Sequence, residues 1–259
     1  MIAVSTFYLF TPLGDATPLR APLLARMKEL DIKGTITLAP EGINATISGA
    51  KDAVEAMVEY LRTMPQFKAI THRLSQFSTQ PFGRSKVKVK PELISLGAAA
   101  DPSICVGSYV APEEWNALIT ADDVVTIDTR NGYEYDIGHF RGALNPATRT
   151  FKQMAAFTKQ HLDPKKHKRV AMYCTGGIRC EKYSAYLLTQ GFEQVFHLQG
   201  GILAYLEQTP EAASLWEGHC YVFDERVAVG HGLTKSEGVV MCTGCGRALF
   251  TGQHCPACE

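Results

Sequence analysis

The sequence has no hydrophobic run approaching the roughly 18 apolar residues that a membrane span needs, so it does not predict an integral membrane protein. Its opening residues, MIAVSTFYLFTPLGD, have neither a basic leader nor a small-residue cleavage site, and we interpret them as a first strand. The sequence also lacks an excess of charge, because 26 Lys and Arg residues balance 26 Asp and Glu residues. A polyanionic partner would therefore have to bind a local basic patch.

Cysteine is scarce, since eight cysteines in 259 residues are too few for a disulfide scaffold. Their clustering instead indicates thiol or metal chemistry in a reducing compartment, so we expect a cytoplasmic protein. Hydrophobic residues make up 46% of the chain and charged residues 20%, values that are typical of a packed globular protein. The length allows two domains with a small appendage.

The first 97 residues show strand and helix patterns in the order βαββαβ. The expected strands are residues 3–10, 34–38, 44–48 and 68–74, and the expected helices are residues 19–30 and 54–61. This order predicts a ferredoxin-like α+β domain over residues 1–97. The small, turn-prone residues 98–108 predict a linker.

Beyond the linker, the pattern changes to buried strands that alternate with helices. The expected strands are residues 124–128, 169–173 and 195–198, and the expected helices are residues 150–161 and 181–190. Nearly continuous apolar strands of this kind are typical of a parallel sheet, so we predict an α/β domain over residues 109–210. Residues 211–259 are Gly-rich and irregular, and we interpret them as a C-terminal extension.

A loop that starts at Cys174 is the most informative segment for chemistry. The preceding strand ends at Tyr173, which predicts that Cys174 lies at the carboxyl edge of a parallel sheet, where α/β proteins form ligand sites. Loop N–H groups, the next helix's N-terminus and Arg179 would all favour a thiolate there. Such a thiolate can attack sulfur or carry it as a persulfide. The alternative is a cysteine that only packs on a turn.

The loop resembles the rhodanese active-site loop, C-x-x-G-x-R-[ST], with Cys174, Gly177 and Arg179 at the matching positions. Upstream, residues 127–145 (IDTRNGYEYDIGHFRGALN) resemble the second rhodanese signature, and LQGGI at 198–202 resembles the closing one. One departure is the last loop position, where rhodaneses carry Ser or Thr and this chain has Cys180. We therefore expect the domain at 109–210 to be a rhodanese domain.

This departure, together with the segments APEGINATISG and CYVFDERVAV, is similar to the rhodanese-type tRNA uridine 5-hydroxylases. The resemblance implies an oxidoreductase that uses molecular oxygen to hydroxylate wobble uridine 34 in the tRNA anticodon loop. It also implies a persulfide on a loop cysteine, and so allows a persulfide donor as a further partner. The cofactor for oxygen activation stays unknown, because we find no dinucleotide-binding fingerprint and no convincing metal-ligand triad.

The motif positions suggest a role for each residue of the site. Cys174 is the expected nucleophile, and Cys180 either resolves a persulfide or pairs with Cys174 in a disulfide, or only caps the following helix. Arg179 either holds an anionic substrate group, caps the loop or is a solvated charge. Asp128 and Arg130 are expected to support the loop from a neighbouring strand end. The remaining loop residues are Thr175, Gly176, Gly177 and Ile178.

Four cysteines near the C-terminus form the pattern C-x2-C–x9–C-x2-C. They are Cys242, Cys245, Cys255 and Cys258. Two such turns let four thiolates converge on one ion, so the pattern predicts a closed, structural zinc site. The alternative is two redox-active pairs. A knuckle of this size could also touch RNA.

Two basic runs are candidates for RNA contacts. The first consists of Arg84, Lys86, Lys88 and Lys90, and the second includes Lys165, Lys166 and Lys168. By themselves such runs are typical of solvated faces or protected edge strands. With tRNA implied as substrate, they become candidates for phosphate contacts that orient the anticodon loop without reading its sequence.

Two other functions stay open at this point. A persulfide sulfurtransferase, acting on thiosulfate or tRNA, would need only Cys174. A non-enzymatic RNA-binding adaptor would carry a retired loop, but the presence of Cys174, Gly177 and Arg179 argues against it.

Overall fold

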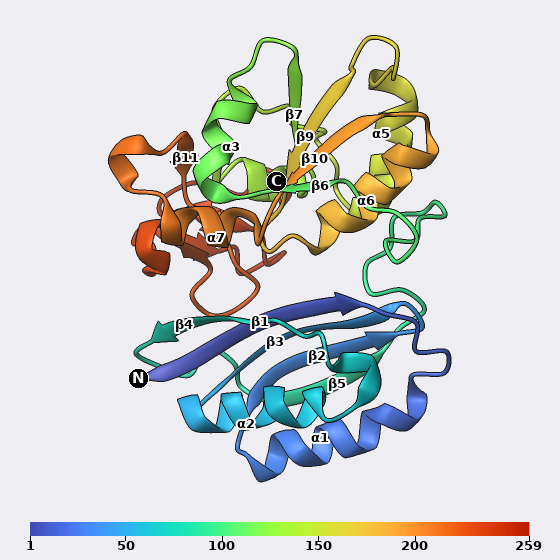
Figure 1. Ribbon diagram of the computed structural model, residues 1–259. Helices are drawn as coiled ribbons and strands as arrows, with labels where there is room; N and C mark the ends of the chain where they lie inside the picture. Colours follow the sequence, from blue (N-terminus) through green and yellow to red (C-terminus); the bar gives the residue numbers. More distant parts are fainter. Residues whose placement is uncertain (259) are drawn as a thin grey trace. The chain divides into compact units, whose positions relative to one another are not determined.

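The computed structural model describes residues 1–258, and the chain divides into two compact units (Figure 1). The first is Met1–Leu93 and the second begins at Ile94. Residues 94–97, which the sequence pattern assigned to the first domain, thus belong to the second unit. Leu96 is fully buried there in a cluster with Ile127 and Val170. Within the described residues, no helix is both long enough and apolar enough to cross a membrane.

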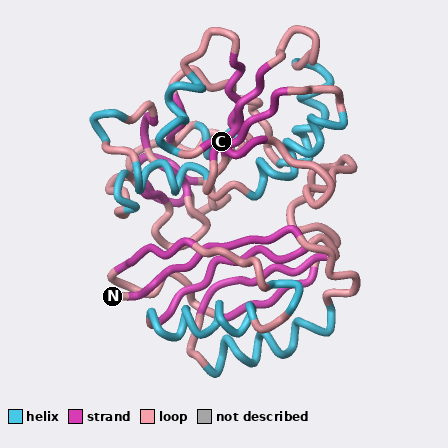
Figure 2. The backbone as a smooth tube through the Cα atoms, viewed as in Figure 1, coloured by secondary structure: helices cyan, strands magenta, loops and turns pink. Residues whose placement is uncertain are grey.

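The first unit is a five-stranded sheet with two helices on one face (Figures 1 and 2). Its strands are β1 (Ile2–Phe10), β2 (Lys33–Ala39), β3 (Gly42–Gly49), β4 (Arg73–Phe77) and β5 (Ser85–Val89), in the order β4-β1-β3-β2-β5. Its helices are α1 (Arg20–Glu29) and α2 (Lys51–Arg62), with a short 3-10 turn, η1 (Thr17–Leu19), before α1. Phe7, Ile36 and Ile47 pack against Leu23 and Val54 of the helices. The predicted ferredoxin-like βαββαβ order is confirmed.

The strand predicted over residues 68–74 is present but begins later, because β4 starts only at Arg73. A turn follows the 3-10 turn η2 (Pro65–Phe67) and occupies the first residues of the predicted range. Phe67 and Ile70 are buried in the core, so the apolar pattern reflects a packed turn. Arg62 fixes this turn by donating from Nε and Nη2 to the carbonyl oxygen of Ile70, at 3.0 and 2.7 Å.

The second unit is built on a four-stranded parallel sheet with helices on both faces (Figure 1). The strands are β6 (Ser108–Val110), β7 (Val124–Asp128), β9 (Arg169–Tyr173) and β10 (Gln194–Leu198), in the order β6-β10-β9-β7. The helices that supply its two apolar layers are α3 (Pro112–Ile119) with α7 (Gly201–Gln208), and α5 (Met154–His161) with α6 (Ile178–Thr189). The predicted α/β domain with a parallel sheet is confirmed. Because the strands are parallel, the residues that follow β7, β9 and β10 meet at one edge.

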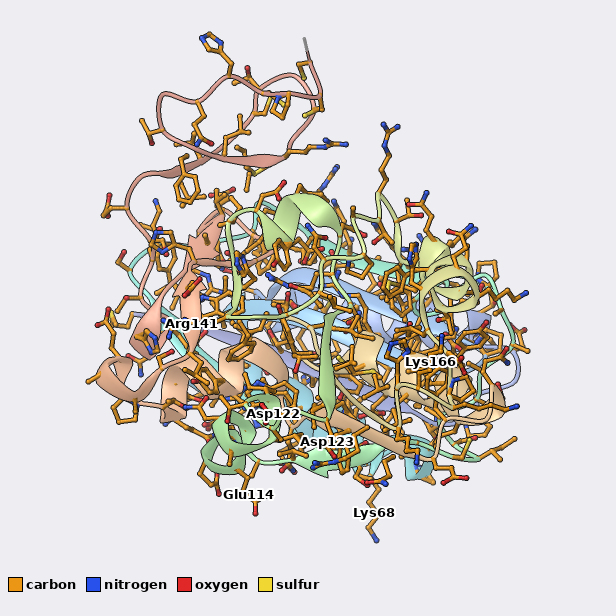
Figure 3. The ribbon with its side chains drawn as sticks, turned by 90° about the horizontal axis from the view of Figure 1, so that it is seen from above. Lys68, Glu114, Asp122, Asp123, Arg141 and Lys166 are labelled. Carbon is orange, nitrogen blue, oxygen red and sulfur yellow. The ribbon has the colours of Figure 1, made fainter. Side chains whose placement is uncertain are left out.

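The second unit also has short elements outside its main sheet. They are α4 (Gly132–Tyr135), β8 (Gly138–Phe140), η3 (Phe151–Gln153), η4 (Glu211–Ala213), β11 (Trp216–Gly218), β12 (Cys220–Tyr221), β13 (Ala228–Val229), η5 (His231–Leu233), β14 (Val239–Met241) and β15 (Ala248–Phe250). Those from η4 onward belong to the C-terminal extension, which is therefore more regular than its sequence suggests. Strand β11 pairs with β8, and the other four strands form two hairpins. The β14–β15 hairpin projects from the rest of its unit in Figure 3, with Val239 and Ala248 packed near Ile137 and Tyr221.

Candidate active site

Cys174 directly follows β9, at the carboxyl edge of the parallel sheet. Its side chain is 1% exposed, and the backbone N–H of Gly177 donates to its Sγ at 3.1 Å. Gly177 has a φ of 106°, a left-handed conformation that favours glycine, and it turns the loop into α6. The loop predicted from the sequence therefore encloses the Cys174 sulfur and directs backbone donors at it.

The surroundings of Cys174 favour its ionised form. Burial raises the pKa of this thiol, but hydrogen bonds from the Cys180 thiol and from backbone N–H groups of Cys180 and Gly177, together with the charge of Arg179, lower it to about 5. The N-terminus of α6 adds a partial positive charge on the same side. These contacts therefore favour the thiolate form of Cys174, the form that reacts as a nucleophile.

Cys180 belongs to the first turn of α6 and is fully buried. The residue at the N-cap is Gly177, and no side chain caps the helix, so the interpretation of Cys180 as a capping residue is wrong. Its sulfur lies 3.5 Å from Oγ1 of Thr129 and contacts Cys174. Burial and the thiolate of Cys174 hold the pKa of Cys180 well above its usual range. These opposite shifts favour a proton on Cys180 and a negative charge on Cys174.

Arg179 pairs with Glu134, a residue that the sequence analysis did not single out. Its Nη1 and Nη2 donate to the two carboxylate oxygens at 2.7 and 2.8 Å, and Nη2 also lies 3.3 Å from Oγ1 of Thr175. Arg179 is 6% exposed and Glu134 is fully buried, which excludes a solvated charge. The sequence signal for Glu134 is the N-x-x-E capping box of α4, from Asn131 to Glu134. This local pattern does not indicate the ion pair with Arg179, which is 45 residues away in the chain.

Glu134 and Arg179 keep each other charged. Burial raises the pKa of Glu134, but the charge of Arg179 and its hydrogen bonds lower the pKa below the usual value. Likewise, burial lowers the pKa of Arg179, but Glu134 raises it above its usual range. The ion pair fixes the guanidinium beside the loop, where its charge favours the Cys174 thiolate.

Asp128 and Arg130 form a second fully buried ion pair at the end of β7. Nη2 of Arg130 lies 2.6 Å from Oδ2 of Asp128 and also donates to the carbonyl of Gly138 at 2.6 Å. Between them, the backbone N–H and the hydroxyl of Thr129 donate to the carbonyl of Tyr173 at 3.0 and 2.9 Å. These bonds hold the segment after β7 against the strand end that leads into Cys174.

The start of α7 supports the loop from its other side. The backbone N–H groups of Ile202 and Leu203 donate to the carbonyls of Cys174 and Thr175, at 2.9 and 3.1 Å. Gly201 has a φ of 64°, and a Cβ at this position would meet the Cys174 carbonyl oxygen at 2.5 Å. Within the segment LQGGI, position 201 therefore requires glycine, because only glycine allows α7 to approach the loop this closely.

The four C-terminal cysteines come together as the spacing predicts. Their sulfur atoms all lie within 4.8 Å of one another, with 3.7 Å between Cys242 and Cys258 and 3.5 Å between Cys245 and Cys255. Tetrahedral thiolate coordination at about 2.3 Å places sulfur atoms about 3.8 Å apart, so these residues fit a metal ion. A Cβ at Gly244 would meet the Cys258 sulfur at 3.0 Å, which explains a glycine there.

The two basic runs lie in different places. The first run is on and around β5, the parallel edge strand beside β2, where Arg84, Lys88 and Lys90 are exposed and Val87 packs into the core. The second run lies in the turn before β9, where Lys166 is labelled in Figure 3. Since β9 runs from this turn to Cys174, the second run is at the opposite sheet edge, roughly 15 Å away.

Comparison with known proteins identifies both units. The UPF0176 acylphosphatase-like domain matches residues 2–93, and the rhodanese-like domain matches residues 111–208, which confirms the predicted rhodanese domain. Among solved structures, a rhodanese-like domain from Anabaena is 19% identical with a TM-score of 0.35, covering 42% of this chain and 78% of its own. An acylphosphatase from Bacillus subtilis is 14% identical with a TM-score of 0.28, covering 34% and 98%. Likeness at this level adds nothing to the assignment.

A relative from Teredinibacter turnerae gives the whole-chain relationship. It is named tRNA uridine(34) hydroxylase and is 51% identical over 243 residues, which cover 93% of this chain and 75% of the relative. The match includes both units, as the resemblance of the loop and of the flanking segments predicted. The chain therefore belongs to the tRNA uridine(34) hydroxylase family.

Proposed function

We propose that this chain hydroxylates carbon 5 of the wobble uridine of tRNA, with molecular oxygen as the oxidant. The observation that carries this proposal is the 51% identity to a tRNA uridine(34) hydroxylase over nearly the whole chain. The intact thiolate loop supports it, because an adaptor without catalytic activity has no need for a thiol whose pKa is lowered to about 5.

In this proposal, Cys174 is the nucleophile and can carry a persulfide. Thr175, Gly176, Gly177 and Ile178 shape its pocket, and Cys180 is the second reactive thiol. Arg179 is a positioning residue, because both of its terminal nitrogens are engaged by Glu134 and its charge acts through Cys174. Asp128 and Arg130 position the loop from β7.

The tRNA anticodon loop is the proposed partner of the basic residues. Arg84, Lys86, Lys88 and Lys90 lie on and around the edge strand β5, and contacts from them to phosphates would orient the RNA without reading its sequence. Lys165, Lys166 and Lys168 lie at the sheet edge opposite Cys174, so they would contact nucleotides far from the wobble base. A wobble uridine is already unpaired, which lowers the cost of placing it in a pocket. A persulfide donor is a further proposed partner, and a tRNA substrate favours a cytoplasmic location.

We infer that the four C-terminal cysteines bind zinc in a structural role. Four sulfur ligands leave no open coordination position, so the ion would stabilise the β14–β15 hairpin without taking part in the reaction. Elemental analysis of the purified chain should find one zinc per molecule, and Cys255→Ser should lose it. A protein that folds fully and retains the hairpin without zinc would contradict this assignment.

Nucleoside mass spectrometry of tRNA from cells that lack this chain tests the function. Re-expression of the wild type should restore 5-hydroxyuridine or its derivatives at the wobble position, and Cys174→Ser should not. The rhodanese fold and the Cys174 thiolate favour sulfur transfer as the second candidate. Restoration of a thiouridine in place of 5-hydroxyuridine would establish that candidate and overturn hydroxylation.

A further inference from the structure

We propose that Cys174 and Cys180 act together as a dithiol that supplies two electrons to each hydroxylation and closes to a disulfide. This inference rests on the proposed function, because the hydroxylation must consume two electrons beyond those of the C–H bond. The two sulfur atoms are in hydrogen-bonding contact between the loop after β9 and the first turn of α6. Both side chains are buried, and the Cys180 sulfur is held beside Cys174 by the first turn of α6 and by the Thr129 hydroxyl at 3.5 Å.

The surroundings of Cys180 fit an internal reductant better than a packing residue. Its side chain is fully buried, and its polar contacts are Cys174 and the Thr129 hydroxyl at 3.5 Å. A capping role is excluded, because Gly177 occupies the N-cap of α6. An oxidised Cys174 would therefore have the Cys180 thiol as its contacting sulfur partner.

The two cysteines differ in their tendency to ionise, and disulfide formation uses this difference. The thiolate form of Cys174 is the species that attacks an electrophilic oxygen, and the protonated Cys180 carries the hydrogen that leaves as water. Arg179 holds a positive charge beside this exchange, and its partner Glu134 keeps the guanidinium in place. The pocket therefore holds one nucleophile, one resolving thiol and one fixed cation.

The balance of atoms and electrons closes on these groups. Insertion of one O2 molecule into the C5–H bond of uridine, which takes the two electrons of that bond, gives a C5 hydroperoxide that holds both oxygen atoms. The Cys174 thiolate attacks the distal oxygen, the O–O bond breaks, and C5 keeps an oxygen that takes a proton while Cys174 becomes a sulfenic acid. The Cys180 sulfur then displaces this oxygen, which leaves as water with the Cys180 proton. Oxygen is reduced by four electrons, of which two come from the C–H bond and two from the thiols.

The count of turnovers without reductant tests this proposal. The reduced, purified enzyme is freed of reductant and mixed with excess tRNA in air-saturated buffer. We expect one 5-hydroxyuridine per chain and one Cys174–Cys180 disulfide, seen as a linked peptide in a non-reducing digest. Added dithiothreitol should then restore turnover. Many turnovers without reductant, with both thiols still reduced, would overturn the dithiol and leave hydroxylation intact.

Cys180→Ser is the matched variant, because a hydroxyl keeps the hydrogen-bond donor to Cys174 but cannot be oxidised. This variant should keep the thiolate absorbance of Cys174, yet make no disulfide and lose the burst of one product per chain. Cys105→Ser, which removes a cysteine outside the loop, should behave like the wild type. A Cys180→Ser burst equal to that of the wild type would contradict the proposal. No 5-hydroxyuridine from the wild type even with reductant would overturn the proposed function itself.

Discussion

Cys174 lies where burial alone would keep its thiol protonated, yet its neighbours reverse that preference. The donors come from its own loop, and the fixed charge of Arg179 is held by Glu134, which is buried at the start of the second unit's α4. The reactivity of one sulfur therefore depends on a carboxylate 40 residues earlier in the chain. Glu134 thus belongs to the site together with the loop residues.

The ionisation of Cys174 can be measured by the ultraviolet absorbance of its thiolate. A thiol with a lowered pKa is ionised at every pH above that pKa, so the thiolate should persist down to about pH 5 and be lost below it. Cys180→Ala removes a donor to the sulfur and should raise the pKa, whereas Cys180→Ser should keep it low. The difference spectrum against Cys174→Ser isolates this group. A midpoint near 8.5, the value of a free cysteine, would contradict the described site.

Glu134→Gln tests the buried ion pair. The change leaves the guanidinium of Arg179 buried without an anionic partner, and we expect the free energy of unfolding to fall by roughly 3–5 kcal/mol. Chemical denaturation measures this loss. Glu193→Gln, at an exposed position before β10, is the control and should change stability by less than about 0.5 kcal/mol. Equal stability of the two variants would show that the pair is not formed in solution.

At the scale of elements, the site depends on two backbone approaches to one loop. Thr129, after β7, donates to the carbonyl of Tyr173, and the first N–H groups of α7 donate to the carbonyls of Cys174 and Thr175. Both sets of hydrogen bonds come from segments that resemble rhodanese signatures. Three motifs that are separate in the sequence thus form one site around the Cys174 sulfur. In the proposed mechanism the central loop carries the reactive sulfur, and the other two segments hold the loop through these hydrogen bonds.

Gly201→Ala tests the approach of α7. The new Cβ would lie 2.5 Å from the Cys174 carbonyl oxygen, and the φ of 64° already disfavours any L side chain. We expect activity to be lost and the pKa of Cys174 to rise as the loop shifts, read from product formation and thiolate absorbance. Gly230→Ala, where a Cβ would meet only the Ser236 hydroxyl at 3.9 Å, is the matched control. Full activity in Gly201→Ala would contradict the role of this contact.

Much of the fold could be predicted because the signals are local. The parallel strands are continuous apolar runs, and the loop from Cys174 to Cys180 is contiguous. The pairing of Arg179 with Glu134 could not be predicted in this way, because it joins residues 45 positions apart through tertiary packing. The strand predicted over residues 68–74 began too early, because Ile70 is apolar but lies buried in a turn before β4. The strands of the C-terminal extension have only two or three residues, too few to show a period of two.

At the scale of the whole molecule, the chain combines a thiolate site in one unit with a cationic edge strand in the other. Its balanced total charge means that attraction to RNA has to come from local patches. The proposed patch on β5 places Lys86, Lys88 and Lys90 on the face opposite to the buried Val87. Binding of tRNA should therefore depend strongly on salt and on these few residues.

Replacement of Lys86, Lys88 and Lys90 by Ala tests this patch. Each phosphate contact contributes about 0.7–0.9 to the slope of log affinity against log salt, so the triple variant should reduce this slope by about 2–3. Fluorescence anisotropy with tRNA over a salt series measures it. A control with the same loss of charge replaces three other exposed lysines of the first unit, Lys28, Lys51 and Lys68. Equal slopes for the two variants would show that the β5 patch does not bind tRNA.

Incubation of the purified chain with tRNA under heavy oxygen gas tests whether the chain hydroxylates uridine with molecular oxygen. Reduced enzyme and unmodified tRNA are incubated with labelled oxygen, and the nucleosides are resolved by accurate mass, which separates an added oxygen from an exchanged sulfur. We predict 5-hydroxyuridine that carries one heavy oxygen atom with the wild type and none with Cys174→Ser. Thiouridine, or 5-hydroxyuridine whose oxygen is unlabelled, would contradict an oxygen-dependent hydroxylase built on this thiolate.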